Sequence, residues 1–304
     1  MVKKLLALAA LAAALVPVSA SAGPAADCSR TSVGLTPLTD LGARKYKGFQ
    51  GGLYPGGKNV PPAGYLAQGV AAAAQVEPID GRVVLLSIGF SNATYEFSVF
   101  KQIADADPRK SPELTIVDGA IPRQSTDVIR DPRARYWRAL LGRLLAAGVR
   151  PDQVQVIWMK TAIAGPTDPF PAYARRLRGY IAEVYAILRR RFPNLKLLYL
   201  ASRTYAGYST ISLNPEPYAY QGGFAVKWFV EDRIRGKVTG PWVGWGPYLW
   251  TDGTKGRSDG LVWTCADVIQ DGVHPTASGR QKVAELLLRF FTSDPTATPW
   301  FVRP

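Results

Sequence analysis

The chain contains a single histidine, His274, and this residue limits the acid–base chemistry that the protein can perform. It stands in residues 271–275 (DGVHP), directly before a strongly helical stretch. A hydrolase that uses a neutral imidazole as its general base has no other candidate in this chain. Asp271 could orient the ring through one nitrogen, which would leave the other nitrogen free to accept a proton. Taken alone, the segment is explained equally well as a turn that precedes a helix.

Ser91 is the candidate nucleophile that this histidine could activate. It follows the apolar run Val83–Ile88, within residues 89–92 (GFSN), at a predicted turn from strand to helix. Such a turn exposes the hydroxyl, and the N–H groups at a helix start can stabilise developing negative charge. A serine that only caps the helix is the competing explanation, and it is the stronger one when the other motifs are ignored.

Two further positions could stabilise an oxyanion. Gly119, in residues 117–120 (VDGA), lets the backbone approach a substrate closely, and its N–H could complete an oxyanion hole with that of Ser91. Alone, Gly119 is better explained as a turn glycine. Lys160, after the next apolar run, could stabilise an oxyanion by charge, hold a carboxylate-bearing ligand or pair with a neighbouring acid.

The candidates for substrate binding are polar and aromatic residues. Arg203 is the strongest of them, because it is predicted at a strand end rather than on a helix face. Tyr205 and Trp250 could stack on sugar rings, although packing explains most aromatic residues of this region better. Asn92, next to the candidate nucleophile, completes the set.

Alternating apolar runs and helical segments predict the fold that must position these residues. From about residue 82 the pattern is typical of an α/β protein with a mainly parallel sheet and no internal repeat. In such a sheet, loops that carry reactive groups meet at the carboxyl ends of the strands. We expect residues 205–223 to be irregular. We expect strands at 83–88, 114–117, 154–158, 195–200 and 242–245, and helices from soon after residue 91 and over about 133–147, 171–191, 224–235 and 277–291.

Together these motifs resemble the SGNH/GDSL hydrolase superfamily over about residues 82–292. Residues 89–92 (GFSN) are similar to the G-Q-S-N block of its carbohydrate O-acetylesterase branch, and residues 271–276 (DGVHPT) are similar to its D-x-x-H ending. The whole chain resembles a group of secreted bacterial SGNH-like proteins. The resemblance implies a three-layer α/β/α, flavodoxin-like fold with a sheet of about five strands. It also implies Ser91 as nucleophile, His274 as base, Asp271 as its orienter and Gly119 as an oxyanion-hole donor.

The third block of the chain departs from the family pattern. An Asn or Gln side chain normally reaches the oxyanion hole there, whereas this chain has Lys160-Thr161. Losing one such donor typically costs about 100- to 1000-fold in turnover. The leading hypothesis is a serine esterase that acts on a small-molecule or polysaccharide ester of carbohydrate or cell-envelope origin. The alternatives are a noncatalytic SGNH-like module that binds anionic glycan through Lys160, Arg203 and the aromatic loops, and a lipid esterase.

The first residues predict export from the cytoplasm. Residues 1–4 (MVKK), the apolar run 5–18 and the small-residue site 20–22 are typical of a signal peptide that covers 1–22. The apolar run is too short to favour a membrane span, so no stable membrane insertion is expected. We therefore expect a secreted or periplasmic protein with an N-terminal extension over 23–80, packed on the core, and an SGNH-like hydrolase domain over 81–304.

Composition narrows the cofactors and partners. The chain has 304 residues and a formal net charge of +14, which favours anionic cell-envelope polymers, although solubility alone also explains the charge. Nucleic acid is not expected as a partner outside the cytoplasm. Cys28 and Cys265 could form a disulfide in an oxidising compartment, and their pairing is left open. With one histidine they cannot supply a convincing zinc site, so we expect neither a metal nor another cofactor.

Overall fold

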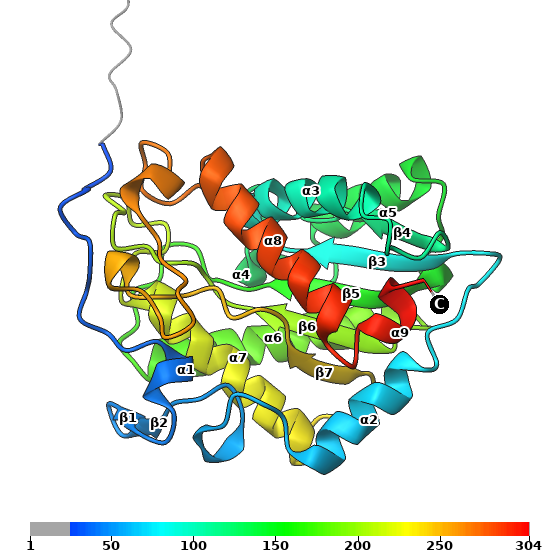
Figure 1. Cartoon of the computed structure of the whole chain (residues 1–304), viewed down its shortest axis with the longest axis horizontal. Helices are drawn as coiled ribbons and strands as arrows, with labels where there is room; N and C mark the ends of the chain where they lie inside the picture. The colour runs from blue at the N-terminus through cyan, green and yellow to red at the C-terminus, as the bar shows by residue number, and fades with distance from the viewer. Residues whose placement is uncertain (1–24, 304) are drawn as a thin grey trace, which may run out of the picture.

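A five-stranded parallel sheet lies at the centre of the computed structural model, which describes residues 25–303 (Figure 1). Its spatial order is β4-β3-β5-β6-β7, and all four neighbouring pairs are parallel. This is the order of flavodoxin-like sheets, so the predicted fold class is confirmed. The strands are β3 (Val83–Ile88), β4 (Leu114–Val117), β5 (Val154–Lys160), β6 (Leu197–Ala201) and β7 (Trp242–Trp245).

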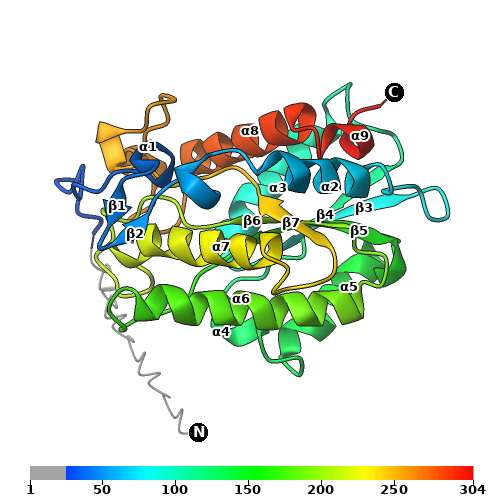
Figure 2. The same ribbon diagram turned by 90° about the horizontal axis from the view of Figure 1, so that it is seen from below.

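Helices cover both faces of the sheet, which makes the three layers (Figures 1 and 2). On one face α3 (Ser91–Asp105) packs against α8 (Ala277–Ser293). On the other face lie α5 (Arg135–Ala146), α6 (Ala172–Arg191) and α7 (Tyr218–Ile234), with the short α4 (Thr126–Ile129) beside α6. Because both faces are covered, the strands are continuous apolar runs rather than alternating ones.

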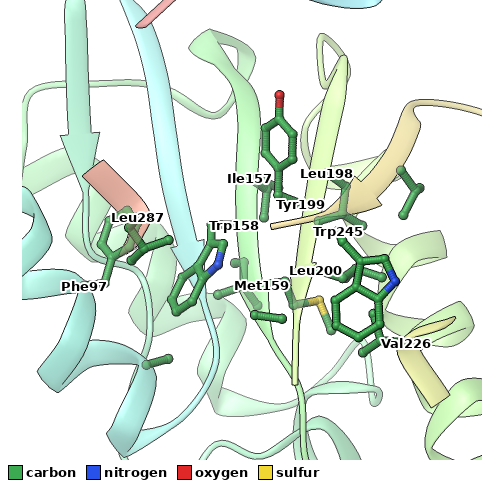
Figure 3. Close-up of a cluster of buried hydrophobic side chains, with 14 of the residues drawn as sticks. Phe97, Ile157, Trp158, Met159, Leu198, Tyr199, Leu200, Val226, Trp245 and Leu287 are labelled. Carbon is green, nitrogen blue, oxygen red and sulfur yellow. The ribbon is translucent and has the colours of Figure 1, made fainter. Parts of the chain in front are cut away.

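Aromatic side chains fill the core between the sheet and α3 and α8. Trp158 of β5 stacks on Phe97 of α3 with 5.5 Å between ring centroids. Phe100 of α3 lies 5.3 Å from Phe291 of α8, again between ring centroids. Figure 3 shows Trp158 and Phe97 together with Leu287 of α8. These contacts fix α3, and therefore its first residue Ser91, relative to the sheet.

The segment before the sheet packs along β7 and α7. Tyr65 donates its hydroxyl hydrogen bond to the carbonyl of Val243 at 2.7 Å, and the Trp242 ring nitrogen donates to the carbonyl of Tyr65 at 3.0 Å. Lys227 of α7 donates to the carbonyl of Gly51 at 2.7 Å. The segment contains α1 (Leu38–Leu41), β1 (Lys45–Tyr46), β2 (Phe49–Gln50), the 3₁₀ turn η1 (Pro55–Gly57) and α2 (Ala63–Ala73).

One helix differs from the sequence prediction. The sequence pattern predicts an irregular segment up to Gly223, whereas α7 begins at Tyr218, directly after Pro217. The polar side chains of Lys227 and Glu231 are buried, because the N-terminal segment covers the outer side of the helix. Polar residues therefore do not mark a solvent-facing side of α7. Its missed start, residues 218–223, contains two adjacent glycines and two tyrosines, which favour an irregular segment.

One disulfide and four short helical elements complete the structure of the described residues. The structure joins Cys28 and Cys265 in a disulfide, with their Cα atoms 5.3 Å apart. The predicted signal peptide over residues 1–22 lies outside the described residues. Within residues 25–303, no helix has the length and apolar character that a membrane crossing requires. The remaining elements are η2 (Pro151–Gln153), η3 (Gly253–Lys255), η4 (Cys265–Asp267) and α9 (Thr298–Phe301).

Candidate active site

Ser91, His274 and Asp271 form a hydrogen-bonded chain at the carboxyl end of the sheet. The Ser91 Oγ lies 2.8 Å from His274 Nε2. On the other side of the ring, His274 Nδ1 lies 2.6 Å from Asp271 Oδ2. Because an ionised carboxylate only accepts hydrogen bonds, Nδ1 carries the ring proton and Nε2 is left to accept the proton of Ser91. This is the geometry of a nucleophile, a general base and an orienting acid.

The loop that carries His274 is fixed by its own backbone. Asp271 Oδ1 accepts hydrogen bonds from the backbone N–H groups of Val273 and His274, each at 2.9 Å. Gly272 has a φ of +68°, and a Cβ there would lie 2.1 Å from the carbonyl oxygen of Tyr208. Only glycine fits this position, so the short spacing between Asp271 and His274 depends on it.

The surroundings of Asp271 keep it ionised. Burial raises the pKa of the Asp271 carboxyl, but hydrogen bonds from the His274 ring and from the backbone N–H groups of His274 and Val273 outweigh burial and lower the pKa overall. An ionised carboxylate at this place stabilises the imidazolium that forms when His274 takes a proton.

Ser91 is the first residue of α3, and this position exposes its backbone N–H as well as its hydroxyl. The N–H groups of Ser91 and Asn92 form no hydrogen bond with the described residues, as expected in the first turn of a helix. The positive end of the helix dipole adds to their attraction for an anion. The Ser91 N–H is therefore available to an oxyanion formed next to the Ser91 hydroxyl.

Ser91 and His274 line a cavity of about 610 Å³. Its volume is within the range of small-molecule sites, and its walls are mainly apolar. Tyr95 lies edge-on to the His274 ring, with 5.9 Å between centroids. The cavity is lined by Phe90, Ser91, Tyr95, Pro122, Arg123, Ser125, Asp127, Val128, Ala162, Ile163, Ala164, Arg203, Leu213, Asn214 and His274.

Gly119 occupies a different place from the one expected of an oxyanion-hole donor. Its N–H donates to Ser87 Oγ at 3.1 Å, and Gly119 does not line the cavity. A Cβ there would lie 2.4 Å from Leu140 and 2.6 Å from the Ser87 carbonyl oxygen. The glycine thus serves close packing between β3, β4 and α5, and its N–H is already bonded within the protein.

Lys160 does not line the cavity either. Its Nζ donates to both carboxylate oxygens of Glu96, at 2.5 and 2.6 Å, and both side chains are fully buried. Burial raises the pKa of Glu96 and lowers the pKa of Lys160 to about 8, while the attraction between the two charges opposes both shifts. Of the three roles that the sequence left open for Lys160, the geometry matches pairing with a neighbouring acid. The expected oxyanion role is corrected accordingly, since Nζ is occupied by Glu96.

Of the four residues predicted to bind substrate, the structure places only Arg203 in the cavity lining. Asn92 donates through Nδ2 to the carbonyl of Val273 at 2.9 Å, so it ties the start of α3 to the His274 loop. The Tyr205 hydroxyl donates to the carbonyl of Arg30 at 2.6 Å. The Trp250 ring nitrogen donates to Glu216 Oε1 at 2.7 Å. Tyr205 and Trp250 are buried packing residues in this structure, because their polar atoms are used inside the protein.

Several cavity residues were missed by reasoning from the sequence. Ser125 and Asp127 follow β4, and Asn214 follows β6. Asn214 is buried, and its Nδ2 donates to the carbonyl of Ile163 at 3.1 Å. Their only sequence signal is a position in loops after parallel strands, which is shared by many residues without a function.

Metal ligands are not gathered in the described part of the chain. Among residues 25–303, no group of three or more His, Cys, Asp or Glu side chains could hold a metal ion. The groups available for chemistry at the cavity include the Ser-His-Asp chain, the free N–H groups of α3, the cations Arg203 and Arg123 and the carboxylate of Asp127.

Comparison with known proteins finds no family and only distant structural similarity. No protein-family model matches the chain, and no curated protein matches it in sequence. Similar solved structures include the salicylyl-acyltransferase SsfX3 from a tetracycline biosynthetic pathway, with 13% identity and a TM-score of 0.39 over 70% of this chain and 55% of that chain. They also include the protein YxiM from Bacillus subtilis, with 10% identity and a TM-score of 0.38 over 69% of this chain and 56% of that chain. The chain therefore matches about half the length of each structure.

The architecture itself defines the class of fold. A five-stranded parallel sheet in the order β4-β3-β5-β6-β7, flanked by helices on both faces, is a flavodoxin-like three-layer α/β/α fold. Similarity at TM-scores below 0.4 carries no argument about activity. The geometry of the cavity is therefore the basis for assigning a function.

Proposed function

We propose that the protein is an SGNH-type serine esterase, which transfers the acyl group of an ester first to Ser91 and then to water. One observation carries this proposal: the unbroken hydrogen-bonded chain from Ser91 through His274 to Asp271, which opens into a cavity of about 610 Å³. A serine that only capped a helix would not need a histidine at 2.8 Å from its hydroxyl.

The reaction follows from the positions of the three side chains. Ser91 Oγ attacks the ester carbonyl carbon while its proton moves to His274 Nε2, and the carbonyl oxygen becomes an oxyanion. When the oxyanion collapses, the bond to the alcohol breaks and the leaving oxygen takes the proton from His274. Water then attacks the acyl-serine in the same way, with His274 accepting a water proton and returning it to Ser91. The carboxylic acid product is released, and Asp271 stays ionised throughout.

The oxyanion hole is the part of the site that differs from the family pattern. The Ser91 N–H is free, whereas the Gly119 N–H and the Lys160 ammonium are bonded to other residues. We expect turnover to be lower than with a complete oxyanion hole, because each missing donor costs about 100- to 1000-fold.

The setting of the reaction is part of the proposal. We propose that the chain is exported by its N-terminal segment and acts in the periplasm or outside the cell on a carbohydrate or cell-envelope ester. The net charge of +14 would favour contact with anionic envelope polymers. The cavity walls would surround a small acyl group or a short part of a polysaccharide.

The test is covalent labelling with a fluorophosphonate, a reagent that phosphonylates activated serine hydroxyls. Intact mass should show one adduct on the wild type and none on Ser91→Ala. Ser125→Ala is the matched control, because Ser125 lines the same cavity but does not contact His274, and it should be labelled like the wild type. Failure to label well-folded wild type, or equal labelling of Ser91→Ala, would reject the serine esterase.

A further inference from the structure

Arg203 is a buried cation in the wall of the catalytic cavity that has no hydrogen-bond partner. It follows β6, has 2% of its surface exposed and lines the cavity with Ser91 and His274. Its Nε and Nη2 are covered atoms without a partner. Its Nη1 also forms no hydrogen bond with residues 25–303, but it is not among the covered atoms, so it is the nitrogen open to the cavity.

The nearby carboxylates do not supply the missing partner. Glu96, Glu216 and Asp271 all lie close enough to act on Arg203 electrostatically. Each is nevertheless bonded elsewhere: Glu96 to the buried lysine and Asp271 to the catalytic histidine. Glu216 accepts three hydrogen bonds, from the Trp250 ring and from two backbone N–H groups. None of these three carboxylates forms a hydrogen bond or salt bridge with the guanidinium.

The guanidinium lies over an aromatic ring. The Arg203 guanidinium carbon lies 5.5 Å from the centroid of the Phe90 ring. A ring face attracts a cation but offers no oxygen to its N–H groups. Burial lowers the pKa of Arg203, yet an arginine remains charged in proteins. A buried charge without a hydrogen-bonding partner is unfavourable, and a ligand that supplies the partner removes that penalty.

We infer that the substrate of this site is an anionic ester, whose carboxylate binds Arg203 while its ester carbonyl lies at Ser91. This inference rests on the proposed function and names its substrate class. A carboxylate oxygen in the cavity would accept a charge-assisted hydrogen bond from Nη1 and bring a negative charge next to the guanidinium. Ala162, Ile163 and Leu213 in the same cavity would contact the carbon segment between the two groups.

The test compares esters that differ only in this charge. The first pair is 4-nitrophenyl hemiadipate and 4-nitrophenyl methyl adipate, which place the acid on the acyl side. The second pair is 4-acetoxybenzoate and its methyl ester, which place the acid on the alcohol side. In at least one pair, wild type should show a kcat/KM for the acid about 100-fold above that for the methyl ester, and Arg203→Gln should lose this preference.

Two variants control for charge and folding. Arg138→Gln removes the same charge from an exposed residue of α5 that does not line the cavity, and it should keep the wild-type preference. Arg203→Lys keeps the cation and should keep part of the preference. In the Ser91→Ala background, calorimetry should detect binding of the preferred acid but not of its methyl ester, and Arg203→Gln should abolish that binding.

The outcomes separate this inference from the proposed esterase. If wild type is labelled at Ser91 but neither acid is preferred, or if Arg203→Gln keeps the preference, the esterase stands and the role of Arg203 is refuted. A lower melting temperature of Arg203→Gln, with the preference intact, would show that the arginine only balances buried carboxylates. If Ser91 is not labelled but Ser91→Ala binds the acid through Arg203, the esterase fails and anion binding stands.

Discussion

Asp271 stabilises the backbone turn that carries His274, the proposed general base. One of its oxygens holds the ring of His274, and the other holds two backbone N–H groups of the same turn. These bonds fix the orientation of the His274 ring and keep the ring proton on Nδ1. Asn92 donates a hydrogen bond from α3 to this turn, which fixes the position of Ser91 relative to His274.

Asp271→Asn should lower kcat of the proposed esterase by about 10,000-fold with little change in KM, because an amide can fix the imidazole in the wrong tautomer. Steady-state hydrolysis of 4-nitrophenyl acetate measures the effect. Asp127→Asn is the matched control, since Asp127 lines the cavity without contacting His274, and it should change kcat less than about tenfold. Equal kcat values for wild type and Asp271→Asn would contradict the assigned role.

The sequence motifs identified the residues of the hydrogen-bonded chain. Ser91 stands in a block that resembles a family motif, and Asp271 and His274 are only three positions apart. The structure brings Ser91, Asp271 and His274 together as the sequence predicted. Gly119 and Lys160 could not be placed in the same way. Their actual partners, Ser87 and Glu96, are ordinary residues of a strand and a helix 32 and 64 positions away, and no local pattern marks such contacts.

At the scale of elements, a buried ion pair links α3 to β5. Glu96 projects from α3 and Lys160 ends β5, so the pair holds the nucleophile helix against the strand next to β3. Both charges are shielded from water, and each depends on the other for its hydrogen bonds. The pair is therefore sensitive to the loss of one member.

Lys160→Met should lower the free energy of unfolding by about 3–5 kcal/mol, because it leaves Glu96 buried without a partner. The double variant Glu96→Leu/Lys160→Met should recover part of this loss, since neither member of the pair is then buried alone. The recovery should be incomplete, because the buried Arg203 loses the attraction of Glu96. Urea denaturation of the two variants and of Glu96→Leu measures the coupling. A double variant as unstable as Lys160→Met would show that packing, not the charge pair, sets the cost.

The same double variant tests the corrected role of Lys160. When folded, it should still be labelled by fluorophosphonate at Ser91, because Nζ does not reach the cavity. Loss of labelling in a folded double variant would return Lys160 to the reaction.

The elements of the sheet were more predictable than α7. Strands of a covered parallel sheet are short apolar runs, so all five were found close to their observed positions. The start of α7, residues 218–223, was missed because it is rich in glycine and tyrosine, which favours an irregular segment. Packing against the N-terminal segment stabilises the helix there, as the bond from Gln221 to the Tyr46 hydroxyl shows.

For the whole molecule, the disulfide between Cys28 and Cys265 joins the start of the described chain to the region before the catalytic loop. The two residues are 237 positions apart, so the bond closes most of the chain into one ring. Long loops lose much conformational freedom when closed, which favours the folded state.

Cys28→Ser/Cys265→Ser should lower the free energy of unfolding by about 2–5 kcal/mol relative to the oxidised wild type. Urea denaturation with and without dithiothreitol measures this. The reductant should destabilise the wild type to the level of the double variant and leave the variant unchanged. A wild type that is insensitive to reductant, with its thiols shown to be free, would contradict the prediction.

The way in which the segment before β3 packs also constrains the order of folding. Tyr65 bonds to Val243, and the Trp245 ring nitrogen donates to the carbonyl of Leu53, across 178 and 192 positions of sequence. The residues synthesised first therefore have to wait for the last strand before they can make their native contacts. Such non-local contacts slow folding and keep the early chain open. That delay suits the proposed export of the chain, because a chain that is still open can be passed through a membrane before it becomes compact.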